Sequence, residues 1–200
     1  LALTALYPIG TTTITWNVTD VNGNVALSTS TSVKVKDMTA PTVITKNITV
    51  SLNVSGTVSI VAADVNNGST DACGIASYSI DRTSFSCTDT GAPKTVILTV
   101  IDIYGNVGTG TALVTVTEPI IPIARTRNIT VQLNAAGTVS IEPSDINNGS
   151  TDNCGIVSYT LSKSTFNCSN VGQNIITLTA TDASGNNSVP VNATVIVQDK

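Results

Sequence analysis

The chain has 200 residues, of which 41% are hydrophobic, 4% aromatic and 11% charged, and its net charge is -4 with a pI near 4.5. Nine Lys and Arg residues are scattered singly and form no basic face for a phosphate backbone, so we expect no nucleic-acid partner. The richness in Thr, Ser, Asn and Val is unusual for a cytoplasmic enzyme and indicates a secreted β protein. The longest apolar runs are far shorter than the roughly 20 residues of a membrane-spanning helix, so we expect no membrane segment.

Residues 1–36 are predicted to be the last two strands of an incomplete module. The stretch "TTTITWNVTDVNGN" (11–24) corresponds to "TVILTVIDIYGN" (95–106) and to "NIITLTATDASGN" (174–186). Trp16 lies on the first of these strands and is expected in the core. The chain has no initiator Met and no leader, so we expect a piece of a longer repeat array.

Two complete modules are predicted to follow, at 38–117 and 119–199. The stretch "NITVSLNVSGTVSI" (47–60) returns 81 residues later as "NITVQLNAAGTVSI" (128–141). The linkers "KDMTAP" and "TEPIIP" contain prolines, which stiffen a connection and remove backbone donors. The predicted organisation is therefore a tandem array with short, stiff joints.

Apolar residues alternate with polar ones inside each module, as at Val96, Leu98 and Val100. This period of two predicts half-buried strands, and no helical period extends over eleven residues. Short strands separated by Gly and Asn turns predict an all-β chain of tandem immunoglobulin-like β-sandwiches. The run "GTGT" (108–111) lacks the strand and helix that a phosphate-binding loop requires, and it is predicted to be a turn.

The four cysteines form two pairs, Cys73 with Cys87 and Cys154 with Cys168, and thirteen residues separate the members of each pair. The chain has no His and no C-x-x-C spacing, so disulfides in an oxidising compartment are favoured over a zinc site. We expect both bonds to be local, each closing a hairpin within its own module. Such a bond would stabilise a module by about 3 kcal/mol.

The stretch "YPIGTTTITWNVTDVNGN" (7–24), followed by "TSVKVKD" and "AP", resembles the end of a hyalin repeat (HYR) module. The complete modules resemble the cysteine-bearing HYR-like variant of long bacterial surface proteins, through "NNGSTDNCGIVSYTLSKSTFNCSNVGQNIITLTATDASGN" (147–186). They depart from the simpler pattern by having "TGAPK" and "VGQN" in place of P-x-G. The resemblance implies an immunoglobulin-like fold and a repeated extracellular building block.

Arrays of this kind occur in large cell-surface adhesins of Bacteroidetes, including gliding adhesins exported by the type IX system, and HYR modules also occur in animal extracellular proteins. The resemblance implies no catalytic residues. It makes cell-surface placement and a role in adhesion the expectation for this chain.

The loop "DVNNGSTDACG" (64–74) returns as "DINNGSTDNCG" (145–155), and we expect each copy to lie where its module meets the preceding one. Carboxylates from three segments would then converge, and Ca²⁺ accepts six to eight such oxygens. The predicted calcium ligands are Asp37, Asp64, Asn66, Asp71, Asp102, Glu118, Asp145, Asn147, Asp152 and Asp182. The alternative is that these residues only form turns and accept backbone hydrogen bonds, with no cofactor. The spacing does not fit an EF-hand loop.

No nucleophile with a tuned base is visible, so the chain is not predicted to be an enzyme. The leading hypothesis is a stalk segment of an extracellular adhesin, whose partners are neighbouring modules and whose surface or glycan ligands bind elsewhere in the full protein. The alternative is a carbohydrate-binding or accessory module of a secreted polysaccharide-active enzyme. The two complete modules offer few aromatic side chains as sugar platforms, and most of these alternate with core positions: Tyr78, Phe85, Tyr104, Tyr159 and Phe166. Self-association through edge strands is a third hypothesis.

Overall fold

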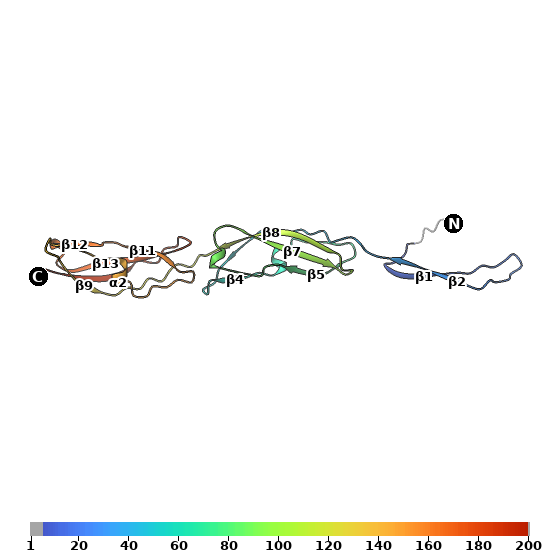
Figure 1. The fold of residues 1–200 in the computed structure, drawn as a ribbon, viewed down its shortest axis with the longest axis horizontal. Helices are drawn as coiled ribbons and strands as arrows, with labels where there is room; N and C mark the ends of the chain where they lie inside the picture. Colours follow the sequence, from blue (N-terminus) through green and yellow to red (C-terminus); the bar gives the residue numbers. More distant parts are fainter. Residues whose placement is uncertain (1–5, 200) are drawn as a thin grey trace.

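The computed structural model describes residues 6–199 and shows a hairpin and two β-sandwiches placed end to end along one axis (Figure 1). Helical structure in this range is limited to single turns, α1 (Ala62–Val65), α2 (Pro143–Ile146), η1 (Cys87–Asp89) and η2 (Cys168–Asn170). The prediction of an all-β chain is confirmed. No helix of the described part is long and apolar enough to cross a membrane.

The first unit is a two-stranded hairpin of β1 (Gly10–Trp16) and β2 (Thr29–Val35), paired antiparallel. Trp16 matches Leu98 and Leu178 of the two sandwiches in sequence, and both of those are fully buried. Trp16 itself is 47% exposed, so the expectation of a core residue is not met. The reason is that no second sheet packs against this hairpin among the described residues.

The first sandwich joins a four-stranded sheet, in the order β3-β8-β7-β5, to a two-stranded sheet of β4 and β6. Its strands are β3 (Ile48–Ser51), β4 (Thr57–Ser59), β5 (Ile75–Ile80), β6 (Ser84–Ser86), β7 (Lys94–Asp102) and β8 (Val107–Thr117). The first and last strands, β3 and β8, pair in parallel, and the other pairs are antiparallel. This arrangement is an immunoglobulin-like sandwich.

The second sandwich repeats the same pairing, with a sheet in the order β11-β13-β14-β9 and a two-stranded sheet of β10 and β12. Its strands are β9 (Ile129–Gln132), β10 (Thr138–Ser140), β11 (Ile156–Leu161), β12 (Thr165–Asn167), β13 (Gly172–Asp182) and β14 (Val191–Gln198). The repeat seen in the sequence is therefore a repeat of strand order and register.

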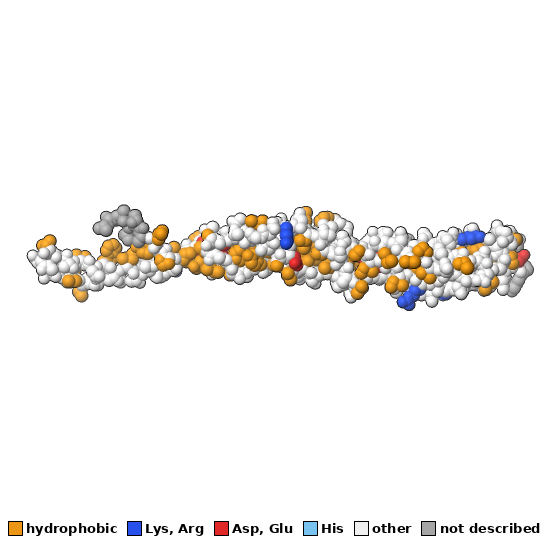
Figure 2. All heavy atoms as spheres, turned by 180° about the vertical axis from the view of Figure 1, so that it is seen from behind, with side chains coloured by type: hydrophobic (Ala, Val, Ile, Leu, Met, Phe, Trp, Pro, Cys, Tyr) orange, Lys and Arg blue, Asp and Glu red, His pale blue; other side chains and the backbone are white. Residues whose placement is uncertain are grey.

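Each sandwich has its own apolar core between its two sheets. In β7, Val96, Leu98 and Val100 are fully buried, as the alternating pattern predicts, and Phe85 of β6 faces them from the other sheet. Burying one such side chain contributes roughly 1.5 to 3 kcal/mol. The outer surface is mostly polar and uncharged, with hydrophobic side chains in scattered groups and few charged ones on the face in Figure 2.

The linker that enters the first sandwich packs along it and does not hang free. Gly108 and Gly110 lie in β8, so the prediction of a turn at this run is wrong. A Cβ atom on Gly108 would lie 2.4 Å from the carbonyl oxygen of Pro41, and one on Gly110 would lie 2.9 Å from the Val43 side chain. Glycine at both positions allows the linker to lie directly against the backbone of β8, where any side chain would clash with it.

The strands β5 and β6, which flank Asp81, belong to different sheets, so they do not form the hairpin that a local bond between Cys73 and Cys87 was expected to close. β5 begins opposite Asp102, next to the preceding unit, while β6 ends opposite Thr57, at the far end of the sandwich. Both strands therefore run in the same direction, and the chain crosses from one sheet to the other between them. This crossing places Cys73 and Cys87 at opposite ends of the sandwich.

Candidate functional site at the junctions between units

The polar side chains singled out in the sequence gather where one unit meets the next. We call the meeting of the hairpin and the first sandwich the first junction, and the meeting of the two sandwiches the second junction. The first junction contains Asp37, Asp71, Ala72, Cys73, Asp102 and Asn106. The second contains Asn53, Gly56, Cys87, Glu118, Asn153, Cys154, Asp182 and Asn186.

A turn that begins with a buried aspartate lies at each junction. Asp102 Oδ1 accepts hydrogen bonds from the N–H groups of Tyr104 and Asn106, both at 2.8 Å, and Oδ2 accepts one from Asn106 Nδ2 at 2.7 Å. Burial disfavours the charged carboxylate, but the hydrogen bonds from Asn106, Tyr104 and Gly105 outweigh it and lower the pKa of Asp102. The turn is therefore built around an ionised aspartate.

The last residue of this turn also holds the end of the preceding unit. Asn106 Nδ2 donates to the carbonyl oxygen of Asp37 at 3.3 Å. Asn186 repeats the contact at the second junction and donates to both the carbonyl oxygen and Oε2 of Glu118, each at 2.9 Å. The same aspartate and asparagine thus shape the turn and fix it to the strand that arrives from the neighbouring unit.

Two acids lie side by side at the second junction, where Glu118 is 6% and Asp182 1% exposed. Burial, and then the neighbouring Asp182, raise the pKa of Glu118. Burial also opposes the charge on Asp182, but hydrogen bonds from Asn186 outweigh it and lower the pKa of Asp182. A proton shared by this pair therefore resides on Glu118.

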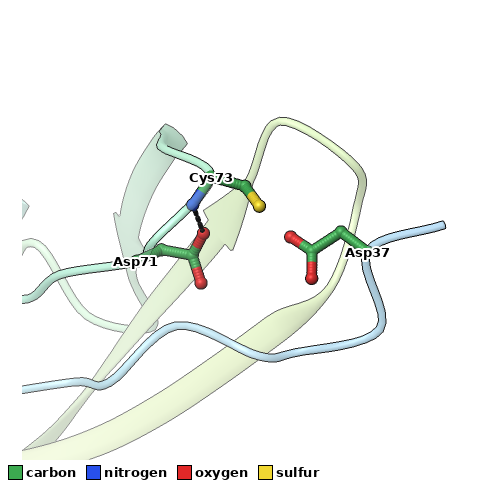
Figure 3. A group of neighbouring side chains, drawn as sticks. All are labelled: Asp37, Asp71 and Cys73. Carbon is green, nitrogen blue, oxygen red and sulfur yellow. Dashed lines mark hydrogen bonds between the residues drawn. The ribbon is translucent and has the colours of Figure 1, made fainter. Parts of the chain in front are cut away.

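At the first junction a thiol lies among acids (Figure 3). Ligand atoms of Asp37, Asp71 and Cys73 lie within 4.8 Å of one another, and the Cys73 N–H donates to Asp71 Oδ1 at 2.8 Å. The Asp37 carboxylate, burial, and the charges of Asp71 and Asp102 raise the pKa of Cys73 to about 11. This thiol is protonated at neutral pH and is a poor nucleophile.

The disulfide of the chain joins the two sandwiches. Cys87, which follows β6, is bonded to Cys154, which precedes β11, with their Cα atoms 5.3 Å apart. Cys73 and Cys168 are free thiols. The prediction of two local bonds, Cys73 with Cys87 and Cys154 with Cys168, is wrong because each such pair spans a whole sandwich from one end to the other.

The close approach around this bond depends on a glycine that the sequence analysis did not single out. Gly56 has φ +70°, and a Cβ atom there would lie 2.8 Å from Cys87 Sγ and 2.9 Å from the carbonyl oxygen of Asn153. Asn153 Nδ2 in turn donates to the carbonyl oxygen of Asn53 at 3.2 Å. A covalent bond, a hydrogen bond and a tight backbone contact therefore close the second junction, in addition to the hydrogen bonds from Asn186 to Glu118.

The repeated loop reaches the first junction only at its end. Thr42 forms a β-bridge with Thr70, and Thr45 forms one with Asn66, so the loop runs antiparallel to the linker. This places Asp71 at the junction, while Asp64 and Asn66 lie several residues further along the sandwich. Asp64 Oδ2 accepts a hydrogen bond from the Val61 N–H at 2.7 Å, within its own turn.

The second copy of the loop is arranged in the same way. Asp145 Oδ2 accepts from the Glu142 N–H at 2.7 Å, and Asn147 Oδ1 accepts from the Ser150 N–H and hydroxyl. Asp152 lies two residues before the disulfide and accepts from the Cys154 N–H at 2.8 Å. The predicted calcium set is therefore divided, with Asp64, Asn66, Asp145 and Asn147 serving as local turn acceptors.

No protein-family model matches the chain, and no curated protein matches it. Among solved structures, a titin I-band fragment, I67–I69, is similar at 12% identity and a TM-score of 0.45, covering 95% of this chain and 75% of that one. Human protocadherin-24 EC1-2 is 13% identical, with a TM-score of 0.42 over 80% of this chain and 99% of that one.

Protocadherin gamma B7 extracellular cadherin domains 1–4 are 11% identical, with a TM-score of 0.39 over 90% of this chain. The chain spans 56% of the length of that fragment. All three neighbours have TM-scores below 0.5, so the assignment of the fold rests on the strand pairing of the chain itself.

Proposed function

We propose that the chain is a non-catalytic segment of an extracellular adhesin stalk, in which HYR-like modules at 38–117 and 119–199 are fixed end to end. The observation that carries the proposal is the bond between Cys87 and Cys154, which joins one sandwich to the next. The effect of this bond is on the geometry between the two units.

Two connections on different layers make this joint stiff. The peptide chain continues to the second sandwich from the C-terminal end of β8, which belongs to the four-stranded sheet. The disulfide starts at Cys87, directly after β6 of the two-stranded sheet. A single connection would act as a hinge, whereas two separated connections oppose bending between them. The hydrogen bonds from Asn153 and Asn186 across the same junction add to this restraint.

The proposed location is extracellular, at a cell surface, because disulfides form and persist in oxidising compartments. The partners we propose are neighbouring modules of the same chain, with adhesive ligands bound elsewhere in the full protein. Export by the type IX system, and a role in gliding, follow from the HYR resemblance and belong to the same proposal.

The test is small-angle X-ray scattering on the chain and on the double variant Cys87→Ser, Cys154→Ser. We expect the chain to scatter as an extended rod, and the variant to show a shorter mean length and a broader distance distribution. The matched control is Cys73→Ser, Cys168→Ser, which leaves the joint intact and should scatter like the original. Identical profiles for all three proteins would remove the stalk proposal.

Calcium at the junctions is a second proposal, supported by buried oxygens that have no hydrogen-bond partner. These are Asp37 Oδ2 at the first junction, and Asp152 Oδ1 and Asn153 Oδ1 at the second. Carboxylate and amide oxygens are suitable Ca²⁺ ligands, and Asp71, Asp102, Glu118 and Asp182 would complete the two sets. The hydrogen bonds already described support the alternative, in which the acids act as turn residues.

Thermal unfolding in excess Ca²⁺ and in EGTA separates these two interpretations. A melting temperature that rises with Ca²⁺, and no longer does so in Asp37→Asn, would support the metal site. An unchanged midpoint would remove it.

The described residues offer few exposed aromatic side chains to support the carbohydrate-binding alternative. Phe85 and Phe166 are 2% exposed and belong to the cores, whereas Tyr78 and Tyr104 are 42% and 47% exposed. A sugar platform needs an exposed aromatic face. Specific binding of the chain on a glycan array would reopen this alternative.

A further inference from the structure

We propose that the free end of the second sandwich, formed by Asn134, Gly137 and Cys168, is a preformed coupling site for another copy of the same sandwich. Its Cys168 would bond to the cysteine that corresponds to Cys154 in the added copy. The proposal rests on the stalk function and extends it, because it makes the bond between Cys87 and Cys154 one joint of a repeating covalent series.

The surroundings of Cys168 match those of the bonded Cys87. The Sγ atom of Cys87 lies 3.7 Å from the Gly56 carbonyl oxygen, and the Sγ atom of Cys168 lies 3.7 Å from that of Gly137. Both glycines have φ +70°, and a Cβ atom on either would lie 2.8 Å from the neighbouring sulfur. Gly137 therefore keeps the same space open around a sulfur that has no bond.

The turn beside each cysteine also has the same internal hydrogen bonds. Asn53 Oδ1 accepts from the N–H groups of Ser55 and Thr57, at 2.9 and 3.2 Å. Asn134 Oδ1 accepts from those of Ala136 and Thr138, at 2.9 and 3.1 Å. At the second junction this turn receives the side chain of the neighbouring unit through the Asn53 carbonyl oxygen. The turn at Asn134 has this shape without a neighbour, so coupling requires no rearrangement there.

The chemistry of the partner follows from the occupied joint. It must carry a thiol, an amide side chain just before it that can reach the Asn134 carbonyl, and a neighbouring backbone that can pass against Gly137. The sequence "NCG" (153–155) of a second copy meets these requirements. Cys168 is exposed, so the thiol is accessible to such a partner.

The other free thiol, Cys73, lacks the features of such a coupling site. Residue 72 is Ala where the second sandwich has Asn153, and Leu6 is the hairpin residue that matches Cys168 when Asp20 is aligned with Asp182. The first junction is therefore a joint in which neither unit carries the full set. This difference gives the coupling a direction, from the Cys168 end of one sandwich to the Cys154 end of the next.

The oxidant for the bond is a low-molecular-weight disulfide such as oxidised glutathione. The Cys168 thiolate attacks this disulfide and releases one glutathione thiolate, which leaves a mixed disulfide at Cys168. The thiolate of the incoming cysteine then attacks Cys168 Sγ and releases the second glutathione. Two protein thiols have been oxidised and one glutathione disulfide has been reduced to two thiols, so atoms and electrons balance.

The test extends the full chain. Asp199 corresponds to Glu118, so a second copy of residues 119–200 can follow directly on Asp199. A Val157→Ile substitution in the added copy, at an exposed position, marks its peptide by mass. After oxidation with glutathione and digestion without reduction, we expect a peptide that joins Cys168 to the marked copy, beside one that joins Cys87 to the unmarked Cys154.

The matched variant is Gly137→Ala in the original copy of the extended chain. It should lower the yield of the new bond at least about fivefold and leave the bond at Cys87 unchanged. A free Cys168 beside an intact Cys87 to Cys154 bond would overturn the coupling site and leave the stalk function standing. A bond between two Cys168 residues of separate molecules would also overturn it. Loss of the Cys87 to Cys154 bond itself would count against the stalk function.

Discussion

The two junctions contain the same type of turn, but only one of them has a disulfide. Both are held by an Asp and an Asn four residues later, Asp102 with Asn106 and Asp182 with Asn186, which fix the end of the preceding unit. Only the second has a disulfide, between Cys154 and the sandwich before it. The turn therefore supplies the contact that both junctions share, and the disulfide is an addition that requires a suitably placed cysteine in each of the two neighbouring units.

Of the changes considered for the two junctions, removing the disulfide should lower the free energy of unfolding most. In the chain-entropy model, a bond that closes a loop of this length contributes about 4 kcal/mol to the free energy of unfolding. Cys87→Ser, Cys154→Ser should lose roughly that amount in urea denaturation, and Cys73→Ser should lose almost none, because Cys73 is free. A loss below about 1 kcal/mol in the double variant would show that the two sandwiches are stable without their covalent joint.

The thiol at the first junction should react slowly until the pH is high. Its pKa is about 11, so the thiolate fraction of Cys73 rises about 100-fold between pH 8 and pH 10. Alkylation followed by peptide mass spectrometry should show this rise at Cys73. Asp37→Asn should increase the rate at pH 8, because Asp37 is the largest cause of the raised pKa. Asp20→Asn, in the distant hairpin turn, is the control, and equal rates in both variants would contradict the role of Asp37.

A pair of glycine substitutions isolates the backbone contact at the second junction. Gly56→Ala and Gly137→Ala place a Cβ atom at the same φ and the same distance from a sulfur, but only the first also meets the Asn153 carbonyl oxygen. Each should cost about 1 to 3 kcal/mol in unfolding, with the larger loss at Gly56. Equal losses would mean that the approach of the two units is loose enough to accommodate a methyl group.

The smallest expected effect is a dependence of stability on pH at Glu118. Because the pKa of Glu118 is raised in the folded state, folding favours its protonated form, and this contribution is lost as the pH rises through the folded pKa. Glu118→Gln should therefore raise the melting temperature at pH 7 by roughly 2 to 4 °C and have little effect near pH 4. Asp20→Asn, in the exposed turn of the hairpin, relieves no buried acid pair, and a gain of the same size there would contradict this explanation.

The sequence predicted the strands well because their alternation is a local signal. Val96, Leu98 and Val100 are buried as the pattern requires, and the hairpin of β1 and β2 forms where the repeat places it. The aspartates that begin the last turns, such as Asp102, could also be identified, because a turn of this kind needs an acceptor followed by N–H donors close in the chain.

The pairing of the cysteines could not be predicted in the same way. It depends on the crossing from β5 in one sheet to β6 in the other, and no residue near Asp81 signals that the chain continues forward instead of turning back. The positions of Asp64 and Gly108 were missed for a related reason, since both depend on the linker lying along the sandwich. Contacts between distant segments decide these features.

The bond between the sandwiches also determines how the chain transmits tension. A pull applied at its two ends would pass along the backbone to Cys87, cross the sulfur atoms to Cys154 and continue from there. The 67-residue separation between these cysteines, which contains β7, β8, β9 and β10, could not be drawn out while the bond is intact, even if the sandwiches unfolded. Roughly 220 Å of contour length is thus withheld from extension. A reducing agent would release it, so the reduced chain could be extended further than the bonded one.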